Sequence, residues 1–369
     1  MPTDMSSIDK VLFIVHLAIG DYTYMQRCFE KLKNVYPNLK ISLFIQDNRR
    51  TEDSEKWAVL DNYILYEWLQ SSKYFDNIYK TYSPQLLEKS SLQAQNENYP
   101  FVISLGDLRS QNYSALARKI AKNNIALGID IRTSFFHFNH RKDLALLDGK
   151  ILDLLDNTQH ISNKFAYWFS QIANLKFSTQ DLYPKINIPH NWQAQIDAQL
   201  QSWIQQTNYP VIFINIYAKG SERCWTSTQA IELIKALKTD SRFIGATFIL
   251  NSPPEASQIL HKEIQNHHLK NTYTFCAINS FFELPALLKR CHLIITVDTS
   301  IMHLACISDA HLISLIRKKP KVDLKWLPLK EKESTIIYTQ NSKDSISAIK
   351  VQRVMDAINK IELRNTNIE

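Results

Sequence analysis

The sequence predicts an α/β protein of two domains, each with a buried parallel sheet covered by helices. Short apolar runs rich in Val, Ile, Leu and Phe recur, and a longer stretch with apolar residues at helical spacing follows each run. The same pattern occurs in both halves of the chain. A length of 369 residues also exceeds the size at which one hydrophobic core usually stops growing.

Four strands are predicted in each half. In the first half they cover residues 11–15, 41–45, 101–105 and 125–129, with helices near 22–35 and 114–122. In the second half they cover residues 211–216, 246–250, 293–297 and 312–316. Helices are also predicted over 161–175 and 192–206, on either side of a polar stretch at 178–190 that contains Pro184 and Pro189.

The hinge between the domains is placed in that polar stretch. The expected organisation is a first domain at 1–180, a second domain at 181–345, and a C-terminal helix within 346–369 that packs back on the first domain. Doubly wound sheets bind ligands beyond the carboxyl ends of their strands. The residues that follow strands are therefore the first candidates for a site.

Composition narrows the class of protein. The chain has 43 basic and 36 acidic residues, and the net charge of +7 favours nucleic acid, an anionic membrane surface or a phosphorylated substrate. No apolar run reaches the roughly 20 residues that span a bilayer. The first run ends in Gly20-Asp21 rather than in a cleavage site, so we interpret it as a strand of a cytoplasmic protein. The five cysteines lack C-x-x-C spacing, which suggests neither a disulfide framework nor a zinc site.

The first candidate group follows the first predicted strand. Gly20 is expected in a tight turn, because glycine adopts conformations that other residues resist. Asp21 then lies at the mouth of the strand. The residue is either a helix cap, which is the common role of Asp at such a position, or a catalytic carboxylate.

The second candidate group is the segment 293–305, a buried strand that ends in Asp298-Thr299-Ser300 and enters a helix. Free backbone N–H groups and the helix dipole favour an anion such as a diphosphate there. The hydroxyls of Thr299 and Ser300 add donors. His303 follows on the first turn, and taken alone it is more often a structural histidine.

The third candidate group is the loop 217–225, after the first strand of the second half. Lys219 and Arg223 in this glycine-bearing loop are suited to phosphate oxygens, since a guanidinium binds them as a fixed fork. A solvated surface turn, with Trp225 packing the next helix, remains the alternative.

Several common motifs are missing. The chain has no G-x-G-x-x-G after a strand and no G-x-x-x-x-G-K-[ST], which disfavours dinucleotide and P-loop binding. It has no D-x-D pair and no metal-ligand cluster with convincing spacing. If a phosphate leaving group takes part, protein cations and backbone amides must neutralise it.

Together the three groups resemble the lipopolysaccharide heptosyltransferases of glycosyltransferase family 9. The segment 297–305 is similar to that family's V-D-T-G-x-x-H-L-A motif, Gly20-Asp21 to its G-D pair, and Arg223-x-Trp225 to its K-x-W. The likeness extends from about residue 11 to about residue 316. There are two departures: Ser300 replaces the usual glycine, and Arg223 stands where lysine is common.

The resemblance implies a GT-B fold of two Rossmann-like doubly wound domains facing each other across a cleft. It implies an inverting transfer of heptose from a nucleotide-diphosphate heptose, ADP-heptose in that family, to a lipopolysaccharide inner-core acceptor. Asp21 would be the general base. The donor would be bound by Lys219, Arg223, Asp298, Thr299, Ser300 and His303. Neither a metal nor another cofactor is implied.

The acceptor side is expected in the first half, where Arg109, Arg132, Arg141 and Lys142 lie near the aromatic stretch 135–138. These cations suit an anionic glycolipid and peripheral, salt-sensitive contact with the inner face of the membrane, or they are simply solvated surface charge. Three alternatives stay open: a GT-B enzyme with another nucleotide sugar or acceptor, a non-catalytic glycan-binding relative, and a nucleic-acid-binding protein. The last is disfavoured because the charges are spread and no recognised nucleic-acid motif is present.

Overall fold

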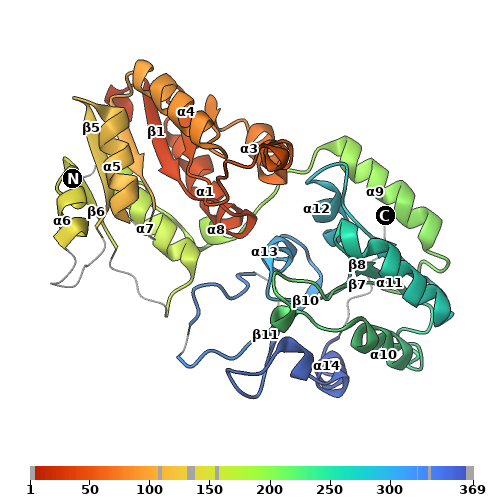
Figure 1. The fold of residues 1–369 in the computed structure, drawn as a ribbon. Coiled ribbons are helices and arrows are strands. Elements are labelled where there is room, and N and C mark those ends of the chain that lie inside the picture. The colour runs from red at the N-terminus through yellow and green to blue at the C-terminus, as the bar shows by residue number, and fades with distance from the viewer. Residues whose placement is uncertain are drawn as a thin grey trace. The chain divides into compact units, whose positions relative to one another are not determined.

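The computed structural model describes residues 5–106, 110–130, 138–153, 158–321, 323–330 and 334–362. The chain divides into two compact units, Met1–Leu182 and Tyr183–Glu369. The boundary falls inside the polar stretch predicted as the hinge. Each unit is an α/β domain with its own parallel sheet (Figure 1).

Unit 1 contains a six-stranded parallel sheet in the order β3-β2-β1-β4-β5-β6. Strand β1 is central, with β2 on one side and β4 on the other. The last five residues of β1 are buried. The strands are β1 (Lys10–Val15), β2 (Lys40–Ile45), β3 (Asn77–Tyr79), β4 (Phe101–Ser104), β5 (Ile125–Asp130) and β6 (Gly149–Leu152).

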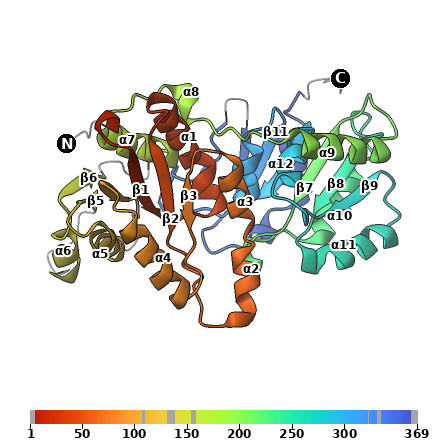
Figure 2. The same cartoon turned by 90° about the horizontal axis from the view of Figure 1, so that it is seen from above.

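Helices cover both faces of this sheet (Figure 2). Alternate residues of β1 point to opposite faces: Phe13 packs against Phe29 and Phe169, with ring centroids 5.3 and 5.6 Å away, whereas Leu12 and Ile14 join a cluster with the helices of the other face. The helices are α1 (Ile19–Val35), α2 (Trp57–Asp61), α3 (Ile64–Ser71), α4 (Pro84–Asn96), α5 (Ser110–Ala121), α6 (Phe138–Leu144), α7 (Ile161–Ala173) and α8 (Thr179–Leu182). Short 3₁₀ turns lie at Met5–Ser7 and Ser54–Lys56.

Unit 2 repeats the plan with the order β12-β11-β10-β7-β8-β9. Its strands are β7 (Val211–Asn215), β8 (Thr247–Asn251), β9 (Thr272–Phe275), β10 (Leu293–Val297), β11 (His311–Ile316) and β12 (Ser334–Tyr338). Its helices are α9 (His190–Trp203), α10 (Ser227–Leu237), α11 (Pro254–Asn266), α12 (Glu283–Leu288), α13 (Ser300–Ala305) and α14 (Val351–Ile358), with 3₁₀ turns at Ser221–Arg223 and Ile346–Ala348. One large core cluster joins the strands to α10, α11 and α14.

The structure differs from the sequence prediction at the edges of both sheets. All eight predicted strands are present, but β3, β6, β9 and β12 were not predicted, and these are the four edge strands. Edge strands contact only one neighbour and are partly exposed, so they lack the continuous apolar run that marks a central strand.

Two further expectations are corrected. Gly20 lies inside the first turn of α1, and among the described residues the glycine with positive φ is Gly220, at 94°. The C-terminal segment does not stand apart from the second domain, because α14 buries Val354 and Ile358 in the core of unit 2. The apolar side chains of this helix recur every three or four residues and form one face.

Candidate active site

The strand order of unit 2 creates a crevice at the ends of β7 and β10. These strands are hydrogen-bonded neighbours, but the chain leaves β7 towards β8 on one side and β10 towards β11 on the other. The loops after the two strands therefore diverge, which is where doubly wound sheets bind ligands. Two of the three candidate groups, 217–225 and 298–303, follow these strands.

Arg223 and Asp298 meet at this crevice. The Nη2 atom of Arg223 donates to Asp298 Oδ2 at 2.8 Å and to the Asp298 backbone carbonyl at 3.0 Å. Among the described residues, Nε and Nη1 of this guanidinium have no hydrogen-bond partner. Both side chains are partly exposed, at 39% and 30%. The pair thus holds a cation at the start of α13 with N–H groups still available to a ligand.

The loop that carries Arg223 is anchored at its end. Trp225 is buried, its backbone N–H donates to the carbonyl of Ile216 at 3.0 Å, and its indole Nε1 donates to the carbonyl of Ile349 at 2.9 Å. Trp225 also belongs to the core cluster that contains residues of the sheet and of α10, which is the packing role considered for it. Lys219, by contrast, is exposed on the outer part of the loop and has no ion-pair partner among the described residues.

A buried amide network supports the ends of the strands. Asn215 donates through Nδ2 to Thr296 Oγ1 and to the carbonyl of Tyr217, both at 3.1 Å, and accepts from Asn251 Nδ2 at 3.0 Å. These contacts link β7, β10 and β8 at their carboxyl ends. Because buried polar groups are costly to leave unpaired, the network fixes the floor from which both loops rise.

The start of α13 presents hydroxyls near Asp298. Thr299 is the N-cap residue, and its side chain makes no capping hydrogen bond, so the hydroxyl stays available. Thr299 and Ser300 are both partly exposed. His303 is buried one turn further, with its ring 5.9 Å from Trp326. Burial lowers the pKa of His303 to about 4, against the opposing charge of Asp298, so the ring is neutral at pH 7.

A cavity of about 570 Å³ adjoins Asp298, beyond the carboxyl ends of β11 and β12. Its walls include the run Arg317-Lys318-Lys319-Pro320-Lys321, together with Arg353 from α14. These residues were not among the predicted site residues, although the run directly follows the predicted strand 312–316, as the other candidate groups follow their strands.

In unit 1, Asp21 is the third residue of α1 at the carboxyl end of β1. Its Oδ2 accepts the backbone N–H of Ala18 at 2.8 Å, so the carboxylate contributes to capping the helix. It is partly exposed. Tyr63 lies close enough for the charge of Asp21 to affect it: burial chiefly raises the pKa of the Tyr63 phenol, and Asp21 adds to the rise.

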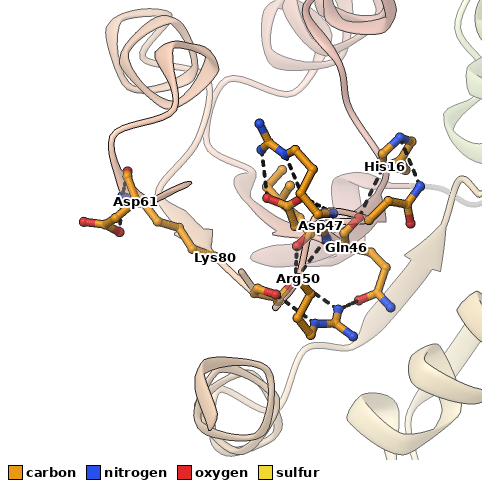
Figure 3. Close-up of polar contacts among 10 residues, drawn as sticks. His16, Gln46, Asp47, Arg50, Asp61 and Lys80 are labelled. Atoms are coloured by element: carbon orange, nitrogen blue, oxygen red, sulfur yellow. Dashed lines mark hydrogen bonds and ion pairs between the residues drawn. The ribbon is translucent and has the colours of Figure 1, made fainter. Parts of the chain in front are cut away.

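A polar cluster missed by the sequence analysis lies at the ends of β1, β2 and β3 (Figure 3). Asp47 is buried, and Arg49 binds it as a fork with distances of 3.0 and 2.8 Å. Arg50 donates to the carbonyl of Thr81 at 2.9 Å and to Gln46 Oε1 at 2.9 Å. Burial alone would raise the pKa of Asp47, but the hydrogen bonds and charge of Arg49 hold it below its ordinary value.

These hydrogen bonds fix the side chains of Arg49 and Arg50 against the rest of unit 1. His16 follows β1 and shares the cluster through its Nδ1, 3.2 Å from the carbonyl of Gln46. Lys80 and Asp61 pair to one side of it at 2.9 Å (Figure 3). The cluster therefore stiffens the loops beside Asp21. The run Asp47-Asn48-Arg49-Arg50, which begins two residues after a predicted strand ends, was the available signal.

The described part of the structure does not bring the predicted acceptor residues together at one site. Arg109 and Arg132 lie outside the described residues. Arg141 and Lys142 are exposed on α6, the helix between β5 and β6, and in the sheet order β4 and β5 separate β6 from β1. Among the described residues, then, the structure does not bring these cations to the strand end that carries Asp21.

The described part of the chain contains neither a membrane-spanning helix nor a metal-binding cluster. No helix there is long and apolar enough to cross a membrane. No group of three or more His, Cys, Asp or Glu side chains there is arranged to hold a metal ion. None of the five cysteines forms a disulfide, and Cys28, Cys291 and Cys306 are buried.

Comparison with known proteins gives the family. The model of glycosyltransferase family 9 (heptosyltransferase) matches residues 92–353. No curated protein matches the chain. Among solved structures, the family 9 glycosyl transferase from Veillonella parvula DSM 2008 is 18% identical with a TM-score of 0.72, over 97% of this chain and 98% of that one.

Two Escherichia coli enzymes are also similar in fold. ADP-heptose lps heptosyltransferase II is 17% identical with a TM-score of 0.63, over 95% of this chain and 97% of its own. Heptosyltransferase WaaC, solved with ADP, is 14% identical with a TM-score of 0.61, over 95% and 99%. The family match covers well over half of the 369 residues, and both units have the doubly wound sheets of the GT-B fold. The chain therefore belongs to glycosyltransferase family 9, the heptosyltransferase family, and is a glycosyltransferase.

Proposed function

We propose that this chain transfers a heptose from ADP-heptose to a lipopolysaccharide inner-core acceptor, with inversion at the anomeric carbon and without a metal ion. Support for the donor comes from the family and from its relatives, one of which is named for ADP-heptose and another of which is solved with ADP. The enzyme would act in the cytoplasm, in peripheral contact with the membrane that carries its acceptor.

The observation that carries the proposal is the Arg223–Asp298 pair at the crevice of unit 2. As the bond from the anomeric carbon to the diphosphate breaks, negative charge grows on the departing phosphate. The Nε and Nη1 groups of Arg223 would stabilise that charge, and the pair orients them before the donor arrives. Thr299 and Ser300 would add hydroxyl and backbone donors, and Lys219 would approach from the exposed part of its loop.

Asp21 is proposed as the general base. The acceptor hydroxyl oxygen attacks the anomeric carbon, its proton passes to the Asp21 carboxylate, and ADP leaves with the electron pair of the broken bond. A base works by holding a defined position, and the 2.8 Å bond from the Ala18 N–H orients Asp21 Oδ2. Arg109, Arg132, Arg141 and Lys142 remain proposed contacts for the anionic acceptor.

The direct test is a donor panel with the purified chain. ADP-heptose, UDP-glucose and UDP-N-acetylglucosamine are each supplied with a heptose-free inner-core acceptor, and transfer is followed by mass spectrometry. We expect product with ADP-heptose alone and inverted anomeric configuration in that product. Turnover with a uridine donor would favour the alternative of a GT-B enzyme with another nucleotide sugar. Donor binding without any product would favour a non-catalytic relative.

A further inference from the structure

The cavity of unit 2 is the feature that the proposed chemistry leaves unused. It extends from Asp298 past the carboxyl ends of β11 and β12, and its volume of about 570 Å³ lies within the range of small-molecule sites. The departing diphosphate of the donor would be held on one side of Asp298, by Arg223 and the start of α13. The cavity lies beside this point, so a ligand in it would be next to the group transferred.

The cavity carries an excess of positive charge. Its walls contain two carboxylates, and each has a partner: Asp298 pairs with Arg223 at 2.8 Å and Asp323 with Lys319 at 2.5 Å. Four wall cations form no ion pair with any described residue: Arg317, Lys318, Lys321 and Arg353. Like charges gathered in a concave site raise the local concentration of anions.

Two of these cations are fixed in place. Arg317 donates through Nε and Nη2 to the backbone carbonyls of Asp344 and Ser342, at 3.0 and 3.1 Å. Arg353 donates through Nη1 to the backbone carbonyl of Tyr338 at 2.8 Å. Neither interaction neutralises the guanidinium, because a carbonyl carries no net charge. Each cation is therefore oriented by the protein and keeps N–H groups for a ligand, which reduces the entropy lost on binding.

The remaining walls suit a sugar ring. Trp326 and Tyr338 line the cavity beside the cations. An aromatic face packs against the C–H face of a pyranose, while charged groups bind its anionic substituent. Trp326 also contacts His303 of α13, so the cavity wall is continuous with the predicted donor site.

We propose that this cavity binds an anionic sugar of the acceptor, one that carries a phosphate or a carboxylate. The assignment rests on the proposed function, because it takes the transferase acceptor to be the occupant. It places an acceptor-specificity site in unit 2, with Arg317, Lys318, Lys321 and Arg353 binding the anion and Trp326 and Tyr338 contacting the ring. Acceptor choice then depends on residues outside the three predicted groups.

The test uses the full chain and four probes: glucose 6-phosphate, glucuronate, glucose and inorganic phosphate. Binding is measured by isothermal titration at low and at physiological salt, with Trp326→Phe as a check that the cavity is the site. We expect one or both anionic sugars to bind more tightly than glucose and inorganic phosphate, and salt to weaken that binding. The phosphate and carboxylate probes distinguish the two sources of charge.

Variants localise the effect. Lys318→Gln/Lys321→Gln removes two charges at exposed side chains that form no hydrogen bond or ion pair among the described residues, so the fold should be retained. We expect anionic-sugar affinity to fall about tenfold or more, and the acceptor KM to rise with kcat and the donor KM unchanged. Lys262→Gln/Lys360→Gln, at two exposed lysines of unit 2 away from the cavity, is the matched control and should change neither.

ADP binding separates the two proposals. If the parent chain binds ADP but neither anionic sugar, the cavity assignment is overturned and the donor site stands. The same conclusion follows if the double variant binds the anionic sugars as tightly as the parent does. If the double variant loses ADP, the cavity belongs to the donor and the assignment is likewise overturned. If the parent binds an anionic sugar but not ADP, the proposed transferase function fails instead. Equal affinity for inorganic phosphate would overturn the sugar-binding part.

Discussion

Arg223 donates through a single nitrogen, Nη2, to both the carboxylate and the backbone carbonyl of Asp298. The two residues lie 75 positions apart in the chain but follow neighbouring strands. Since one nitrogen makes both contacts, the rest of the guanidinium is held in a defined orientation. This orientation suits Arg223 to the role proposed for it, which is to bind the leaving diphosphate.

Removing the guanidinium should weaken donor binding. We expect Arg223→Gln to lower the affinity for ADP by roughly 10- to 100-fold, the usual cost of losing hydrogen bonds to a charged group. Arg223→Lys should recover part of the loss, because lysine keeps the charge but not the fork. Isothermal titration with ADP measures both. Arg242→Gln, which breaks the Arg242–Asp240 pair at 2.6 Å elsewhere in unit 2, is the control and should leave affinity unchanged.

Asp21 should affect turnover rather than donor binding. We expect Asp21→Asn to lower kcat by about 10² to 10⁴, the usual contribution of a positioned base, with ADP affinity preserved. Asparagine can still accept the Ala18 N–H, so the melting temperature should change little. The control is Asp9→Asn, at an exposed position of the same unit. Near-normal turnover of folded Asp21→Asn would remove Asp21 from the role and make His16, which also follows β1, the next residue to test.

Activity should survive chelation. In the proposed chemistry, protein cations and hydroxyls neutralise the leaving group, so a transfer assay in excess EDTA should give the same initial rate as the untreated enzyme. A rate abolished by EDTA and restored by Mg²⁺ or Mn²⁺ would refute this part of the mechanism.

The buried His303 should make unit 2 less stable in mild acid. Its pKa is about 4 in the folded chain against an ordinary 6.5, so the unfolded state binds a proton more readily over that interval. The stability that comes from keeping the His303 ring neutral is fully present above pH 6.5 and is lost as the pH falls towards 4. At pH 5 the loss should be about 2 kcal/mol. Urea unfolding at pH 7.5 and 5 tests this: His303→Gln should lack that part of the pH dependence, and exposed His261→Gln should retain it.

Trp225 should matter for stability through its anchor. Trp225→Phe removes the Nε1 donor to the Ile349 carbonyl and some buried volume, but Gln229 Nε2 still donates to that carbonyl at 3.0 Å. We therefore expect a moderate destabilisation of roughly 1–2 kcal/mol in urea unfolding. Trp203→Phe should cost less, because the ring stacked on Tyr273 is partly exposed and a phenyl ring preserves the stacking. A smaller loss at Trp225 than at Trp203 would argue against the anchor.

The sequence by itself determined the fold class, the central strands and the family. Residues 11–15 are all apolar, and residues 293–297 are apolar except for Thr296, because central strands of a parallel sheet are buried on both faces. That pattern is visible without a structure. The segment 297–305 carried the family resemblance because its residues are contiguous. The group at 217–225 was found for the same reason.

Only the tertiary structure decided which of these residues meet. Strand order places the loops after β7 and β10 together, and this order depends on long-range packing rather than on local spacing. The cavity also depends on long-range packing, because Arg353 of α14 lies beside a run of residues that follows β11. Long-range packing likewise decides the edge strands and the burial of α14 in unit 2. Local sequence sets which segments bury an apolar face, but the partner that covers this face is chosen by contacts between distant parts of the chain.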